Sequence, residues 1–466
     1  MFSISKLYNI ITGRGKTPPA ANIIQRMLEE CAHAKGGEVS ARARATSLAD
    51  LYLKLDREGR RVFLIALSLE FAPDHNLLTA AFDKYNRAAD IQSRCYAETT
   101  LRMAMYSPRK RILTMFNAIP MGVKFLVDLR AELLGFIKET PELKVLDSEL
   151  KECLTAWFDV GFLDLIRLTW NSPAILLEKL TKYEAVHKIN SWQDLKNRLD
   201  DSDRRCYAFF HPKMPVEPLI FVQAALTDKL EGNVQELLDE NAPPHDASQA
   251  TTAIFYSISN CQDGLRGITF GNFLLKRVIE SMSRDFPKLK TFATLSPIPG
   301  LANWMENNPR ELADACYPAD RERLAELGIT GSRDPVFKNI VKNPQEYMNN
   351  AALTAALKEP LMRTAAKYLV VAKTDGRPAD YVARFHLGNG AQVERLNWMA
   401  DSSKKGFSQS LGIMVNYLYD PDKLEENVEK FTGEGKISIS PIIKKMTERA
   451  SHSDIAKTLK KRRGKK

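Results

Sequence analysis

The 466-residue sequence has no apolar run long enough to cross a membrane. Its longest apolar stretches, residues 218–226 and 368–372, fall far short of the roughly 20 residues that a transmembrane helix needs. The six cysteines form no Cys-x-x-Cys pair and follow no secretory signal, which argues against a zinc ribbon and against a disulfide framework. We therefore expect a soluble protein of a reducing compartment, without a membrane partner.

The sequence also has little excess charge outside its last residues. The formal net charge is +10, but residues 456–466 hold seven Lys and Arg and no acid, and the rest of the chain has 60 basic and 57 acidic residues. A short basic end of this kind is typical of a solvated, disordered tail. We therefore expect no nucleic-acid partner.

The first 28 residues contain four basic residues and no acid. This composition weakly resembles an organellar transit segment and suits a bacterial cytosolic N-terminus at least as well. The final Gly-Lys-Lys is not a peroxisomal Ser-Lys-Leu signal. We expect a cytoplasmic, bacterial location, with the mitochondrial matrix as the alternative.

The chain is long enough to form two hydrophobic cores, and the pattern of its apolar residues changes once along the sequence. Up to about His187, apolar residues recur at spacings of three and four, which predicts a helical bundle with no catalytic motif. After Trp192, short runs rich in aromatic and branched residues predict strands at 205–210, 219–226, 251–258 and 290–295, with a helix at 273–284 and a helical insertion at 301–367. The predicted fold class is α+β: a helical domain at 1–190, a mixed α/β domain at 191–455 and the tail at 456–466.

Residues 262–272 read Gln-Asp-Gly-Leu-Arg-Gly-Ile-Thr-Phe-Gly-Asn and lie between a predicted strand and a predicted helix. The loop lacks the Gly-Lys-Ser/Thr of a Walker loop and the context of a Rossmann fingerprint, and an ordinary tight turn is the alternative. Its glycines let the backbone approach a ligand, and the helix N-terminus favours an anion. The arrangement resembles the acetyl-CoA-binding element of the GNAT acetyltransferase fold, which implies an acyl-CoA ligand.

Ser296 follows the next predicted strand but lacks the Gly-x-Ser-x-Gly setting of a hydrolase nucleophile. Pro297 has no backbone N–H, so it cannot supply the oxyanion donor of a nucleophile elbow. Covalent acyl-enzyme chemistry is therefore disfavoured. A serine in a rigid double-proline turn is the alternative.

Several runs together resemble the malonyl-CoA decarboxylase family over about residues 168–419. They are Phe-His-Pro-Lys-Met-Pro-Val-Glu-Pro-Leu at 210–219, Ser-Pro-Ile-Pro-Gly at 296–300, Ala-Arg-Phe-His-Leu-Gly-Asn-Gly at 383–390 and Met-Val-Asn-Tyr-Leu-Tyr at 414–419. The resemblance implies a catalytic serine at Ser296, a catalytic histidine at His386, an active-site tyrosine at Tyr419 and an important lysine at Lys179. It places the CoA phosphate loop at Arg266, Gly267, Ile268, Thr269, Phe270, Gly271 and Asn272.

The resemblance further implies a carboxy-lyase that converts malonyl-CoA into acetyl-CoA and CO2, in malonate or fatty-acid metabolism, without metal, biotin or thiamine. It also implies a GNAT-like catalytic domain and a helical domain that forms homo-oligomers, as dimers or tetramers. Since the thioester carbonyl serves as the electron sink, the enzyme needs only to stabilise the enolate, orient the carboxylate and protonate C2. We expect His386 to donate that proton, directly or through water, Ser296 to hydrogen-bond the malonyl group, and Tyr419 to fix the geometry.

Each assignment has an alternative. A histidine between Phe385 and Leu387 is also typical of a packed structural residue, and a tyrosine such as Tyr419 in an apolar strand is also typical of a core. Two other functions fit a CoA loop: a GNAT-type acyltransferase, which needs an amine acceptor and a base, and a non-catalytic acyl-CoA sensor.

Overall fold

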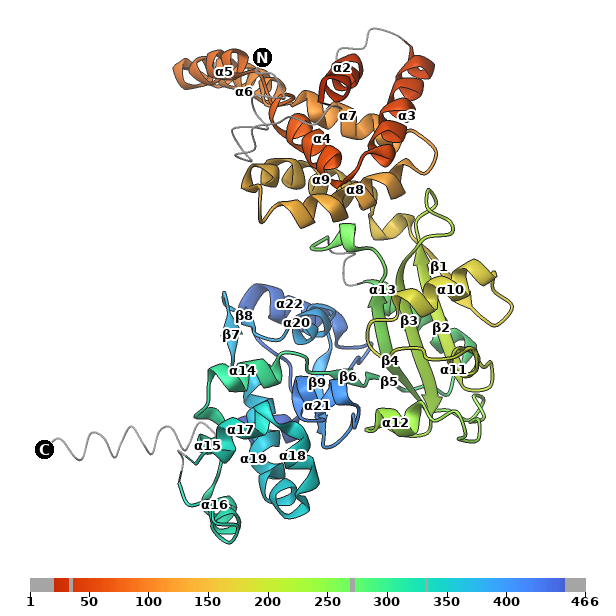
Figure 1. Ribbon diagram of the computed structural model, residues 1–466, viewed down its shortest axis with the longest axis vertical. Coiled ribbons are helices and arrows are strands. Elements are labelled where there is room, and N and C mark those ends of the chain that lie inside the picture. The colour runs from red at the N-terminus through yellow and green to blue at the C-terminus, as the bar shows by residue number, and fades with distance from the viewer. Residues whose placement is uncertain (1–20, 33–36, 269–272, 332–333, 449–466) are drawn as a thin grey trace, which may run out of the picture. The chain divides into compact units, whose positions relative to one another are not determined.

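The computed structural model describes residues 21–32, 37–268, 273–331 and 334–448 (Figure 1). Two compact units make up the chain. The first comprises Met1–Asp164 with Phe210–Leu219 and Asn260–Phe270, and the second comprises Leu165–Phe209, Ile220–Ser259 and Gly271–Lys466. The predicted tail at 456–466 and the last four predicted phosphate-loop residues, at 269–272, lie outside the described residues.

The first unit is helical, as the spacing of its apolar residues predicts. Its helices are α2 (Ala21–Ala32), α3 (Glu38–Lys54), α4 (Arg57–Leu69), α5 (His75–Arg87), α6 (Ile91–Ala104), α7 (Pro108–Asn117), α8 (Gly122–Phe136) and α9 (Lys144–Trp157), with 3-10 turns η1 (Pro141–Leu143), η2 (Val160–Phe162) and η3 (Asp263–Leu265). Helix α4 begins after Asp56, whose carboxylate accepts the Gly59 N–H at 2.7 Å and so caps the helix. The run from Val62 to Leu67 is fully buried and forms the centre of this bundle.

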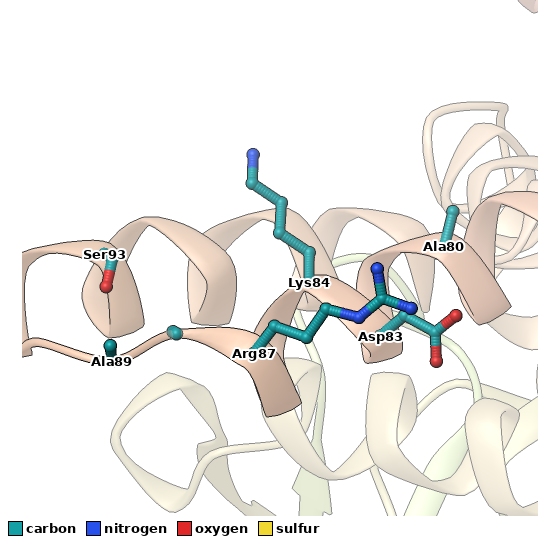
Figure 2. A pocket seen from close by; sticks show the side chains of 7 residues that line it. Ala80, Asp83, Lys84, Arg87, Ala89 and Ser93 are labelled. Atoms are coloured by element: carbon teal, nitrogen blue, oxygen red, sulfur yellow. The ribbon is translucent and has the colours of Figure 1, made fainter.

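Helices α5 and α6 differ from the rest of the bundle. They pack against each other as a hairpin, and each buries a single residue, Ala81 on α5 and Ala97 on α6. The side chains of Lys84, Arg87 and Ser93 border an open hollow at the turn between the two helices (Figure 2). Most of the hairpin surface is therefore exposed.

The second unit is built on a mixed sheet with helices, and the mixed α/β architecture predicted from the sequence is confirmed. Its strands are β1 (Asp164–Leu168), β2 (Arg204–Phe210), β3 (Pro218–Thr227), β4 (Thr252–Asn260), β5 (Thr291–Thr294), β6 (Ser296–Pro297), β9 (Gln392–Asn397) and β10 (Met414–Leu418). The order is β1-β2-β3-β4-β5-β10-β6, and β9 pairs with β10. A separate two-stranded sheet joins β7 (Lys373–Thr374) to β8 (Arg377–Pro378).

Strands β4 and β5 are parallel, whereas β10 runs antiparallel to β5 and β6. A parallel pair needs a crossover connection, and α13 (Phe273–Asp285) supplies it between β4 and β5.

The remaining helices are α10 (Ala174–Tyr183), α11 (Trp192–Arg198), α12 (Val234–Leu237), α14 (Leu301–Asn307), α15 (Glu311–Asp314), α16 (Pro318–Ala325), α17 (Val336–Lys342), α18 (Pro344–Asn349), α19 (Ala351–Val370), α20 (Tyr381–Gly388), α21 (Lys404–Ser410) and α22 (Leu424–Glu434). Helices α14 to α19 confirm the predicted helical insertion.

No helix within the described ranges combines the length and the apolar character needed to cross a bilayer. All six cysteines lie in the described part of the chain, and none forms a disulfide.

Candidate active site

Strand β10 aligns two of the predicted site residues on one face of the sheet. Its pairing places Val415 opposite Ser296 and Leu418 opposite Ala293, so the register puts Tyr417 opposite Thr294. The Tyr419 N–H continues the pairing with a 2.8 Å hydrogen bond to the Phe292 carbonyl. Because side chains alternate along a strand, Thr294, Ser296, Tyr417 and Tyr419 all point to the same face.

Helix α20 brings His386 to this face. Its N-cap is Asp380, whose Oδ1 accepts the Ala383 N–H at 2.9 Å. The other carboxylate oxygen of Asp380 lies 3.4 Å from the N–H of Gly300, at the end of the turn that begins with Ser296. The buried Asp380 therefore links the start of α20 to the serine turn.

Ser296, His386 and Tyr419 form a hydrogen-bonded triad. Ser296 Oγ lies 3.1 Å from Nε2 of His386, and the Tyr419 hydroxyl lies 2.7 Å from Nδ1. A phenol donates a hydrogen bond more readily than it accepts one, so we assign the N–H of a neutral imidazole to Nε2 and let Nδ1 accept from Tyr419. The Ser296 hydroxyl is then free to donate a hydrogen bond of its own, and it donates one to Thr294 Oγ1 at 2.9 Å.

The triad is buried and uncharged. Burial lowers the pKa of His386 from 6.5 to about 3, so the imidazole is neutral at pH 7. Burial also raises the pKa of Tyr419 well above its ordinary value, which keeps the phenol protonated. The sequence does not reveal this burial, which depends on the packing of the ring away from water.

Tyr417 is a neighbour of His386 that the sequence reasoning missed. Its ring stacks on the imidazole with centroids 4.4 Å apart and planes 24° apart. The alternation along β10 could have indicated it, because Tyr417 lies two residues before Tyr419 and therefore on the same face.

The beginning of the predicted phosphate loop is well defined within the first unit. Gly267 has a positive φ of 75°, and a Cβ at Gly264 would lie 1.7 Å from the Val127 carbonyl oxygen of α8. Buried Arg130 of α8 donates hydrogen bonds to the carbonyls of Gly264 at 2.6 Å and Arg266 at 2.9 Å. The helical unit therefore shapes this loop, a role that its sequence pattern did not indicate.

Cationic side chains lie at the described part of this loop, residues 262–268. Arg266 is exposed and lies 3.6 Å from Asp263. Lys151 of α9 has its ammonium group 3.5 Å from the position that a Cβ would take on Gly267. Ile268 is buried. Thr269, Phe270, Gly271 and Asn272, which were predicted to complete the loop, lie outside the described residues.

Lys179 lies half-buried on α10, and the hydrogen bonds that join the triad do not pass through it. Its importance stays a prediction. Within the described ranges, no group of three or more His, Cys, Asp or Glu side chains is placed to hold a metal ion.

Comparisons with known proteins identify the family of the chain. Family models described as the malonyl-CoA decarboxylase N-terminal and C-terminal domains match residues 71–158 and 161–458. The mitochondrial malonyl-CoA decarboxylase of Anser anser anser is 35% identical over 418 residues, which cover 86% of this chain and 82% of that protein. The crystal structure of malonyl-CoA decarboxylase from Rhodopseudomonas palustris is 38% identical with a TM-score of 0.81, over 92% of this chain and 100% of that one. The chain therefore belongs to the malonyl-CoA decarboxylase family.

Proposed function

We propose that this chain is a malonyl-CoA decarboxylase, a carboxy-lyase that converts malonyl-CoA into acetyl-CoA and CO2. The observation that carries the proposal is the neutral triad of Ser296, His386 and Tyr419, in which each member can donate a hydrogen bond toward the next. Such an arrangement suits a reaction that must stabilise an enolate and add a proton to it.

The triad favours decarboxylation over the two kinds of chemistry that need a base. An acyltransferase must deprotonate its amine acceptor, and a serine nucleophile must lose its own proton, both with a base whose pKa is near the working pH. A histidine whose pKa burial lowers to about 3 is a poor base at pH 7. Pro297 also leaves the position after the serine without an N–H donor.

In the proposed reaction, the bond between C2 and the carboxylate carbon breaks, and CO2 leaves. The electron pair passes to C2 and is delocalised onto the thioester oxygen, and a proton then adds to C2. Ser296 keeps 6% of its surface exposed and is the triad member that we place against the malonyl group. His386 lies behind it, supplies the Nε2–H to Ser296 Oγ, and accepts from Tyr419 at Nδ1. The proton that C2 takes up comes from Nε2 of His386, directly or through water, and a proton from solvent then restores His386.

We also propose that the loop at Arg266, Gly267 and Ile268 binds CoA phosphates, together with Thr269, Phe270, Gly271 and Asn272. Exposed Arg266 and the nearby Lys151 ammonium group would attract phosphate, and the left-handed Gly267 lets the backbone approach it. No organic cofactor is needed for a substrate that carries its own electron sink.

We infer that the chain forms homo-oligomers, as dimers or tetramers, through the α5–α6 hairpin. Large apolar side chains are exposed on both helices, among them Phe82 at 54% and Ile91 at 85%. Exposed apolar side chains on a hairpin with little contact to its own bundle are typical of a protein interface. The helical domain, taken as 1–190, would thus serve assembly, and the mixed domain at 191–455 would serve catalysis.

A cytoplasmic location and a place in malonate or fatty-acid metabolism complete the proposal. The mitochondrial matrix is the alternative location, since the relative from Anser anser anser is named as mitochondrial. Fractionation of cells that produce the untagged chain would separate the two locations.

Consumption of malonyl-CoA with and without added primary amine tests the function. We expect acetyl-CoA and CO2 to form at the same rate in both cases. Turnover that requires the amine and yields a malonyl amide would establish a transferase instead. Tight binding of malonyl-CoA without turnover would indicate a sensor.

A further inference from the structure

The imidazole of His386 contacts two tyrosines of β10 in different ways. Tyr419 meets it nearly edge-on, with planes 75° apart, and binds Nδ1 through its hydroxyl. Tyr417 lies face to face with the ring. One tyrosine therefore offers a hydrogen bond and the other offers an aromatic surface.

The hydroxyl of Tyr417 takes no part in the contact with His386. It is fully buried, and within the described part of the chain it has no hydrogen-bond partner. The contact between Tyr417 and His386 is consequently one of ring faces.

The backbone of Tyr417 is joined to the serine side of the triad. Its N–H donates to Thr294 Oγ1 at 3.2 Å, and the same oxygen accepts from Ser296 at 2.9 Å. Tyr417 thus contacts His386 through its ring and, through Thr294, is tied to Ser296 by its main chain. A residue in this position can hold His386 and Ser296 in a fixed arrangement relative to each other.

We propose that Tyr417 is a positioning residue whose ring face fixes the plane of the His386 imidazole. The second side-chain torsion of histidine has broad energy wells, so packing must hold the ring in place. A rotation of the ring out of its plane would move Nε2 from Ser296 and Nδ1 from Tyr419. The stacked ring blocks this rotation and also excludes water from one face of the imidazole.

The kinetics of Tyr417→Phe and Tyr417→Leu test this role. This kinetic test rests on the proposed decarboxylase activity. Phenylalanine keeps the ring, so we expect kcat within about twofold of wild type. Leucine removes the ring, and we expect kcat to fall roughly 10- to 100-fold with KM nearly unchanged, because geometry rather than binding is lost. Tyr207→Leu is the matched control: Tyr207 is likewise a buried tyrosine of the sheet, on β2, and its loss should lower stability without lowering kcat in this way.

A second readout does not depend on activity. Histidine-selective NMR labelling resolves seven histidines, and His386→Asn assigns the signal of interest. We expect the His386 ring to stay neutral down to pH 4 in wild type and in Tyr417→Phe. In Tyr417→Leu we expect its pKa to rise toward 6.5, since water reaches the open face.

Three results would overturn the proposal. A folded Tyr417→Leu with wild-type kcat and an unchanged His386 titration would show that the ring is not needed. A Tyr417→Phe variant as impaired as the leucine variant would assign the role to the hydroxyl. Equal losses of kcat in Tyr207→Leu and Tyr417→Leu would mean that general loosening of the sheet is the cause. If the wild-type chain does not decarboxylate malonyl-CoA, the proposed function fails, but the NMR titration still decides the stacking role.

Discussion

The hydroxyl of Tyr419 lies 2.7 Å from Nδ1 of His386, and no carboxylate of the described residues binds that nitrogen. In a serine hydrolase the corresponding partner is an aspartate, which stabilises the imidazolium that forms when histidine takes the serine proton. A neutral phenol gives no such stabilisation. It fixes the tautomer of a histidine that stays neutral.

Replacement of Tyr419 by phenylalanine should therefore impair catalysis. The change leaves Nδ1 buried without a partner, which costs about 1–3 kcal/mol and corresponds to roughly a 10- to 100-fold loss of kcat if the cost falls on the reactive geometry. Steady-state kinetics with malonyl-CoA measure this loss. Tyr256→Phe is the control, because Tyr256 also donates a buried hydrogen bond, to Gln223, from β4 of the same sheet. Equal kcat in Tyr419→Phe and wild type would contradict the assignment.

The titration of His386 should affect stability and activity differently. The unfolded chain binds a proton at this histidine near pH 6.5, whereas the folded chain binds it only near its lowered pKa of about 3. Stability from His386 is thus fully present above pH 6.5 and is lost as the pH falls toward 3. His187, whose pKa burial lowers to about 4, acts in the same direction in every variant.

Melting curves between pH 7 and pH 4 measure this effect. We expect the Tm of wild type to fall more steeply toward pH 4 than the Tm of His386→Asn. Over pH 5–8, titration of His386 should cause no change in kcat. A change in kcat near pH 6.5 that follows the NMR titration of the His386 ring would contradict the assignment of a neutral imidazole.

The phosphate loop predicts an effect on binding alone. Arg266→Ala and Lys151→Ala should each raise KM for malonyl-CoA by about fivefold, the size expected for an exposed ion pair of up to about 1 kcal/mol, with kcat unchanged. Malonyl-pantetheine, which lacks the phosphates, is the matched control substrate. If these substitutions raise its KM equally, they do not act through phosphate.

The hairpin predicts a change of mass in solution. Sedimentation equilibrium should give an oligomer for the wild-type chain and a smaller species for Phe82→Asp combined with Ile91→Asp, since buried charge at an interface is costly. Leu53→Asp is the control, because Leu53 is 57% exposed on α3, outside the hairpin. A double variant that keeps its oligomeric mass would exclude the hairpin as the contact.

Much of the second unit could be predicted from local sequence. The runs at 205–210, 219–226, 251–258 and 290–295 became β2, β3, β4 and β5, because each is dense in aromatic and branched residues that pack in a sheet. In the first unit, the helices followed from the spacing of their apolar residues. The resemblance named Ser296, His386 and Tyr419, and the structure brings these three within hydrogen-bonding distance. Their catalytic roles stay predictions, as do the domain boundaries.

The features of the site that the sequence analysis did not predict depend on contacts between residues far apart in the chain. The stacking of Tyr417 on His386 requires the pairing of β10 with β5 and β6, more than 100 residues earlier in the chain. The lowered pKa of His386 follows from the burial that this pairing creates. Arg130 and Lys151 reach the loop at 264–267 from helices that show no local sign of a binding role.

The most direct test of the central claim is the release of acetyl-CoA and CO2 from malonyl-CoA by the purified chain, with EDTA and without any acceptor. Wild type should turn over, and Ser296→Ala and His386→Asn should each reduce kcat at least about a hundredfold, while the folded state persists by circular dichroism. If wild type binds malonyl-CoA but releases neither product, or if both variants keep full activity, the account of this triad is wrong.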